Sequence, residues 1–81
     1  MDFDAFIQAG WKDHADHPDE VAKRLESSLH LVGSPEHVPV FSHLLTHVFG
    51  EHLGEWQRGI TLLEHLRVLP VVTAASPVAA A

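Results

Sequence analysis

The stretch LGEWQRG, residues 53–59, decides the fold, because it connects two amphipathic helical segments through a glycine. Gly54 is the residue type that ends helices in the left-handed conformation and lets the chain reverse. Gly59 follows at the spacing where two antiparallel helices approach each other, and Trp56 is an aromatic anchor for the second helix. This stretch therefore predicts a helical hairpin.

Apolar residues recur at helical spacing through most of the remaining chain. Asp2 is placed to cap a first helix, and Pro18 and Pro35 stand where prolines begin helices. We expect an all-α domain over residues 1–69, with four helices that span about residues 3–14, 18–32, 35–53 and 55–68. Residues 70–81 are rich in Ala, Val and Pro, which predicts a loosely ordered tail or a linker.

Residues 53–67 resemble the turn and second helix of a tetratricopeptide repeat. Residues 54–56 correspond to the family's Gly-Asp-Tyr turn, Gly59 to its small residue at the helix contact, and Leu63 to a large apolar position. Three positions depart from the family's pattern, namely His47, Gly50 and Leu66. The resemblance implies two antiparallel helical hairpins, a short tetratricopeptide-like bundle, that would bind a peptide or partner protein on a concave helical surface.

The chain has 81 residues, no cysteine and a formal net charge of -6, since five Lys and Arg stand against eleven Asp and Glu. This charge repels phosphate backbones and anionic lipid headgroups, so we expect neither nucleic acid nor membrane as a partner. Without cysteine the fold has no disulfide and no thiolate ligand. The sequence shows neither the pattern of a secretory signal nor a run of about 20 apolar residues, which favours a cytoplasmic location.

The sequence offers no catalytic motif. Its serines lack the context of a nucleophile elbow, and it contains neither a glycine-rich phosphate loop nor a paired-histidine metalloprotease motif. Asp13 and His14 are neighbours, as are Glu51 and His52, but adjacent side chains on a helix point about 100° apart and cannot form direct dyads. We therefore expect a non-enzymatic protein without a cofactor.

The last predicted helix is apolar around much of its circumference. Trp56 and Ile60 belong to the face expected in the core, whereas Leu62 and Leu69 lie roughly 100° or more from the centre of that face. Either the tail or the first helix covers these leucines, or they form a docking strip with Arg58 beside it. The second alternative predicts an interaction module that binds a protein or peptide partner or self-associates, by itself or as the N-terminal helical domain of a longer protein.

Eight histidines make transition-metal binding the competing prediction. His43, His47 and Glu51 follow one another at single-turn spacing on the outward face of the third predicted helix, so they would present two imidazoles and a carboxylate together. Zinc or nickel needs three or four such ligands, and His37, His65 or a second chain would complete the set. A solvated polar face without metal is the alternative.

His14 and His52 occupy equivalent positions when the first predicted hairpin is superimposed on the second. Both lie near helix ends, where an imidazole donates to the last free carbonyl groups and, if protonated, favours the negative end of the helix dipole. Because imidazoles ordinarily titrate near pH 6.5, the histidines together also predict a pH-responsive protein. Its solubility or self-association would change between about pH 5 and 7.

Overall fold

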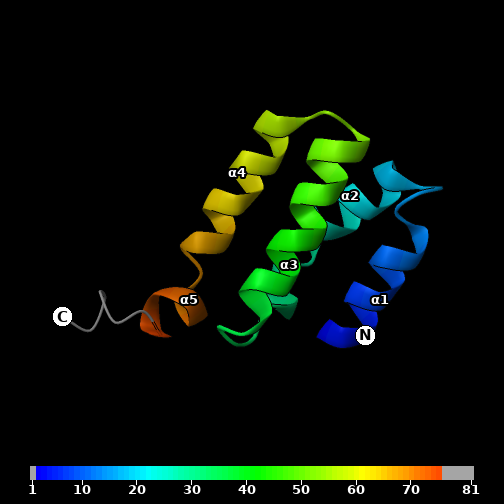
Figure 1. Ribbon diagram of the computed structural model, residues 1–81. Helices are drawn as coiled ribbons and strands as arrows, with labels where there is room; N and C mark the ends of the chain where they lie inside the picture. Colours follow the sequence, from blue (N-terminus) through cyan, green and yellow to red (C-terminus); the bar gives the residue numbers. More distant parts are fainter. Residues whose placement is uncertain (1, 76–81) are drawn as a thin grey trace.

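The computed structural model describes residues 2–75, and every regular element in this range is helical. The elements are, in chain order, α1 (Phe3–Asp13), α2 (Pro18–Ser27), the 3-10 helix η1 (Leu29–Leu31), α3 (His37–Thr46), the π-helix η2 (His47–His52), α4 (Trp56–Arg67) and α5 (Pro70–Ala75). The all-α class predicted from the sequence is confirmed. Figure 1 shows α3 between α1 and α4, with α2 further back. None of these helices has the length and apolar character needed to cross a membrane.

The first two helices begin where the sequence predicts. Asp2 caps α1, since its Oδ1 accepts a hydrogen bond from the Ala5 N–H at 2.8 Å. Pro18 occupies the first turn of α2, where its missing N–H costs no helical hydrogen bond. The second helix ends at Ser27 rather than near Gly33, because the chain then tightens into η1.

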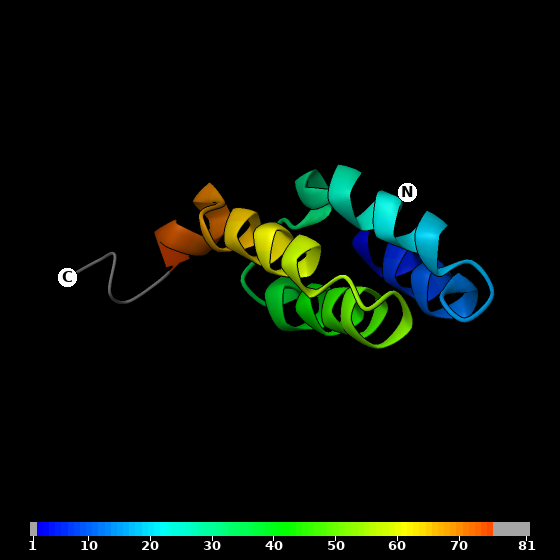
Figure 2. The same ribbon diagram turned by 90° about the horizontal axis from the view of Figure 1, so that it is seen from above.

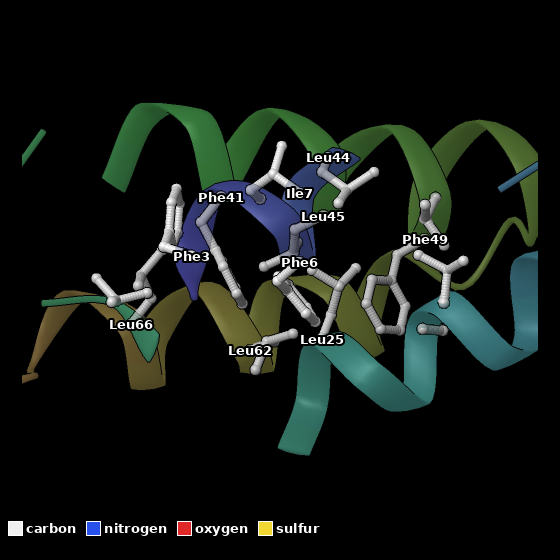
Figure 3. Close-up of a cluster of buried hydrophobic side chains, with 14 residues drawn as sticks. Phe3, Phe6, Ile7, Leu25, Phe41, Leu44, Leu45, Phe49, Leu62 and Leu66 are labelled. Atoms are coloured by element: carbon white, nitrogen blue, oxygen red, sulfur yellow. The ribbon is translucent and has the colours of Figure 1, made fainter. Parts of the chain in front are cut away.

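The core lies between α3 and the helices α1, α2 and α4. Its side chains fill the space that separates α3 from α2 and α4 (Figure 3). In the view from above, α2 lies on the opposite side of this core from α3 (Figure 2). The buried hydrophobic residues are Phe3, Phe6, Ile7, Val21, Ala22, Leu25, Val32, Phe41, Leu44, Leu45, Val48, Phe49, Leu62 and Leu66. Full burial of each large side chain contributes about 1.5–3 kcal/mol relative to exposure, so this cluster is the main source of stability.

η2 continues α3 without a break but with a different hydrogen-bond pattern. The Leu53 N–H donates to the Val48 carbonyl at 3.0 Å, which is the five-residue spacing of a π-helix. Gly54 then adopts a φ of 66°, and the Glu55 N–H donates to the Phe49 carbonyl at 2.7 Å. The reversal predicted at Gly54 is confirmed, because this left-handed conformation is the one that favours glycine.

α4 approaches α3 at Gly59, as the sequence predicts. A Cβ built on Gly59 would lie 3.0 Å from the Cβ of Phe49, so a side chain at this position would push the two helices apart. The approach also sets the rotation of α4, because the residues that share this side of the helix turn inward together with Gly59.

This rotation of α4 differs from the predicted one. Leu66 is buried, as the sequence predicts, but Leu62 is buried as well, whereas Trp56 and Ile60 are 59% and 46% exposed. Trp56 is therefore not the core anchor expected from the sequence. Its ring lies against Gly50 of η2, where an added Cβ would overlap the six-membered ring. The prediction failed because apolar residues surround most of α4, so that their spacing does not select one face.

The segment after Leu69 is not a tail over its whole length. Residues 70–75 form α5, and Val71 packs against the edge of the core. The prediction of a loosely ordered tail is therefore wrong for these residues, because Pro70 starts a helix here rather than only ending the previous one. The rest of the predicted tail, residues 76–81, lies outside the described residues.

Candidate metal centre

Three histidine side chains converge at one end of the helices. His14 follows the last turn of α1, and His47 and His52 are the first and last residues of η2. One ring atom from each histidine lies within 4.8 Å of the other two, and no other group of His, Cys, Asp or Glu in residues 2–75 shows this convergence. The ring centroids of the three pairs are 4.8, 4.9 and 5.0 Å apart. We call these three residues the histidine cluster.

The π-helix brings His47 and His52 together. An α-helix, at about 100° per residue, would place these two side chains about 140° apart. η2 instead closes its turn over five residues, so that residue i+5 returns to the side of residue i. The two Nε2 atoms consequently lie 3.1 Å apart.

Polar contacts at Nδ1 orient two rings of the histidine cluster. His47 Nδ1 lies 2.7 Å from Glu51 Oε2, and His14 Nδ1 lies 2.5 Å from the Trp11 carbonyl oxygen. A carbonyl only accepts hydrogen bonds, so His14 Nδ1 carries the proton and donates it. In the neutral His14 ring, the Nε2 lone pair is then available to a metal ion. His47 Nδ1 instead forms an ion pair with Glu51 when the ring is protonated.

Trp11 forms an aromatic wall beside the histidine cluster. Its ring centroid lies 5.1 Å from those of His14 and His43 and 5.3 Å from that of His47. His14 and His47 are half-buried next to this wall, whereas His52 is exposed. The cluster is therefore sheltered on the side of Trp11 and open to solvent on the side of His52.

A salt bridge fixes the helix end that carries His14. Arg24 of α2 donates from Nη1 to Asp13 Oδ2 at 2.8 Å. This hydrogen bond lowers the pKa of the Asp13 carboxyl. The C-terminal end of α1 is thus tied to α2, and the bonded Asp13 oxygen belongs to Arg24 rather than to the imidazoles.

The structure brings together only part of the predicted metal-binding set. His47 belongs to the cluster, but His43 packs edge-on against Trp11 and supplies no atom to the convergent group. Glu51 contacts His47 and is likewise outside that group. His43, His47 and Glu51 line one pocket. The ligand atoms that converge belong instead to the histidine cluster, so metal binding by the predicted set stays a prediction.

The two histidines predicted to complete the metal set lie elsewhere. His37 stacks on Phe3 with 3.8 Å between ring centroids, and its Nδ1 accepts a hydrogen bond from the Gly33 N–H at 3.1 Å. His65 lines a separate pocket beside Arg58. Neither residue belongs to the convergent group, so the structure does not place them with His47 as the prediction expects.

Sequence reasoning missed His14 and His52 as partners of His47. It placed both at helix ends, and His14 does bond a terminal carbonyl as predicted. It also assumed α-helical winding up to Leu53, which puts His52 on a different side from His47. Gly50 is the available signal for the π turn, because glycine disfavours α-helical winding by about 1 kcal/mol relative to alanine.

The two leucines of the docking strip predicted on α4 are covered, one fully and one partly, in this structure. Leu62 is 4% exposed and belongs to the core, and Leu69 is partly buried against it. The exposed position predicted for Leu62 is therefore wrong. Arg58, the predicted polar neighbour, is bonded within the chain, since Nε donates to Glu26 at 3.0 Å and Nη1 to Glu55 at 2.8 Å.

Arg58 connects α4 to α2 through Glu26, whereas Glu55 lies directly before α4 itself. The hydrogen bond from Arg58 lowers the pKa of Glu26, and the bond to Glu26 in turn raises the pKa of Arg58. The guanidinium carbon also lies 5.1 Å from the ring centroid of Phe49, a cation-π contact. Arg58 thus has a structural role that needs no external partner.

No protein-family model, curated protein or solved structure matches this chain. The resemblance of residues 53–67 to a tetratricopeptide repeat therefore stays a prediction from the sequence. The geometry of the histidine cluster carries the functional inference.

Proposed function

We propose that this protein binds one divalent transition-metal ion, zinc or nickel, through His14, His47 and His52. The observation that carries the proposal is the convergence of one ring atom from each histidine within 4.8 Å. His14 Nδ1 has a hydrogen-bonded partner and His47 Nδ1 lies beside a carboxylate, which is the usual arrangement around metal-binding histidines.

The donor set suits these ions. Zinc binds imidazole nitrogen at about 2.0–2.1 Å, so two tetrahedral ligand atoms lie about 3.4 Å apart. The Nε2 atoms of His47 and His52 lie 3.1 Å apart in a hydrogen bond, and one ring atom of each of the three histidines lies within 4.8 Å of the other two. A bound ion would replace the proton that the two Nε2 atoms share. Imidazole is a ligand for zinc, nickel and copper, whereas calcium and magnesium prefer oxygen.

The electrostatic surroundings favour a cation at this place. His14 and His52 mark the C-terminal ends of α1 and η2, where carbonyl groups carry partial negative charge. The Glu51 carboxylate and the chain's formal net charge of -6 act in the same direction. Because His52 is exposed, a fourth coordination position would face solvent and take water or an added ligand, as in open zinc sites.

Isothermal titration calorimetry with zinc and nickel tests this proposal. We expect one ion per chain with micromolar or tighter affinity, lost in His52→Ala and in His47→Ala. His43→Ala is the matched control. His43 lies in α3, which η2 continues, and contacts the Trp11 ring, but it is outside the cluster. Failure of the wild-type chain to bind either ion, or loss of binding in His43→Ala with retention in His52→Ala, would contradict the proposal.

We further propose, as a second function, that the chain is an interaction module within a tetratricopeptide-like pair of hairpins. The exposure of Trp56 and Ile60, one turn apart on α4, supports this proposal. Self-association is the form of interaction that can be measured without knowing the partner. Sedimentation velocity should show a concentration-dependent dimer that Ile60→Glu weakens, and a wild-type chain that stays monomeric at high concentration would exclude it.

A further inference from the structure

We propose that Gly50 and Trp56 are positioning residues of the metal centre, because together they hold the π turn that pairs His47 with His52. This inference rests on the metal binding proposed above. It assigns a role to two residues that supply no ligand atom to the cluster.

The pairing of His47 with His52 depends on the winding of residues 47–52. These two residues share one side of η2 because its turn closes over five residues. If the same segment wound as an α-helix, the two imidazoles would separate by about 140° and could not bind one ion. Whatever stabilises the π turn relative to an α turn therefore also stabilises the metal centre.

Gly50 and Trp56 contact each other at the middle of this turn. Gly50 is buried, and an added Cβ would overlap the six-membered ring of Trp56. Trp56 is 59% exposed, and the part of its ring that is covered includes the contact with Gly50. Glycine at position 50 serves two purposes, since it lowers the preference for α-helical winding and leaves room for the indole.

The backbone transmits this contact to the ligands. The bonds from Leu53 N–H to the Val48 carbonyl and from Glu55 N–H to the Phe49 carbonyl close the turn between Gly50 and Trp56. The aromatic ring that contacts the imidazoles directly is Trp11, at centroid distances of 5.1 and 5.3 Å. Trp56 also lines a pocket with His47 and Glu51, but it supplies no ligand atom, so its role is to support the winding of η2.

Cobalt(II) and zinc titrations of Gly50→Ala and Trp56→Ala test this role. We expect affinity to fall about 10-fold or more in both variants, as for other residues that support metal ligands. We also expect the visible cobalt bands of a tetrahedral site to weaken, and Trp56→Phe to restore most of them. Circular dichroism should show that helix content is retained.

Two control variants match these changes. Gly33→Ala adds the same methyl group where the nearest atom would be 3.9 Å away, and Ile60→Ala truncates another exposed apolar residue of α4. Both should bind cobalt with wild-type affinity and spectrum. Wild-type metal affinity and cobalt spectrum in Gly50→Ala would overturn the positioning role while leaving the metal site intact. Absence of binding by the wild-type chain would overturn both proposals.

A change of ligand spacing provides an independent test. The double variant Glu51→His with His52→Ala has imidazoles at positions 47 and 51, the spacing that an α-helix brings together. This variant should bind zinc weakly, and adding Gly50→Ala should strengthen its binding, because alanine favours α-helical winding. If Gly50→Ala weakened zinc binding in this background as well, the proposed dependence on the π turn would be wrong.

Discussion

Glu51 determines which nitrogen of His47 faces the other two imidazoles. Its carboxylate lies 2.7 Å from His47 Nδ1, whereas Nε2 of the same ring lies 3.1 Å from His52 Nε2 and so faces the cluster. A partner of this kind fixes the orientation of a metal-binding ring and increases its basicity. The carboxylate itself is 67% exposed, so solvent screens its direct attraction for a metal ion.

Glu51→Ala should weaken zinc binding about 10-fold, because the ring of His47 loses the acceptor that orients it. Glu51→Gln should cost less, since its amide oxygen can still lie against Nδ1 and accept a hydrogen bond from it. Calorimetric titration of both variants measures the difference. A loss as large as that of His47→Ala would show that Glu51 is a ligand, as the sequence alone predicts.

Glu26 makes stability depend on pH through its bond with Arg58. The pKa of Glu26 is lowered from 4.5 in the folded protein, so the bond stabilises the fold fully above that value and less as pH falls through the folded-state pKa. Glu26→Gln should reduce the free energy of unfolding by about 0.5–1 kcal/mol at pH 7, the range of a surface pair. Urea unfolding at pH 7 and at pH 3 should show this difference shrinking. An equal loss from Glu64→Gln, a control on α4, the helix that carries Arg58, would contradict the assignment.

At the scale of the elements, the starts of helices were predictable and their rotation was not. Asp2 and Pro18 act on the backbone next to them, so the beginnings of α1 and α2 follow from local sequence. The rotation of α4 depends on the turn that precedes it, and apolar spacing does not indicate that this turn is a π turn. For the same reason the sequence identified His47 but not its pairing with His52.

Truncating Leu62 and Ile60 to alanine, one at a time, tests the rotation of α4. Leu62→Ala should reduce the free energy of unfolding by about 2–5 kcal/mol, because Leu62 is 4% exposed and its loss leaves a cavity. Ile60→Ala should change it by less than about 1 kcal/mol, because Ile60 is 46% exposed. Urea unfolding of both variants makes the comparison. A larger loss from Ile60→Ala would support the rotation predicted from the sequence.

At the scale of the whole molecule, the histidine cluster joins segments that are distant in the sequence. His14 ends α1, whereas His47 and His52 belong to the continuation of α3, so a bound ion would cross-link the two helices. A chain of 81 residues buries only about 60–65% of its surface on folding. One additional cross-link is therefore a considerable part of its stability.

Zinc should consequently stabilise the folded chain against heat. At a free zinc concentration about 100 times the dissociation constant, binding adds about 2.7 kcal/mol to the free energy of unfolding. For a domain of this size the corresponding increase in Tm is about 10–20 °C. Differential scanning calorimetry of the wild type and of His14→Ala measures the effect. A similar increase in both proteins would show that the ion does not bridge α1 to η2.

The assignment of the ligands is tested most directly by long-range 1H–15N NMR of the histidine rings during a zinc titration. This measurement identifies the protonated nitrogen and the metal-bound nitrogen of each imidazole. We predict that Nε2 of His14, His47 and His52 shifts on binding, that Nδ1 of His14 and His47 stays protonated, and that the other histidines do not change. Shifts at His43 and His47 without changes at His14 and His52 would contradict the proposed centre.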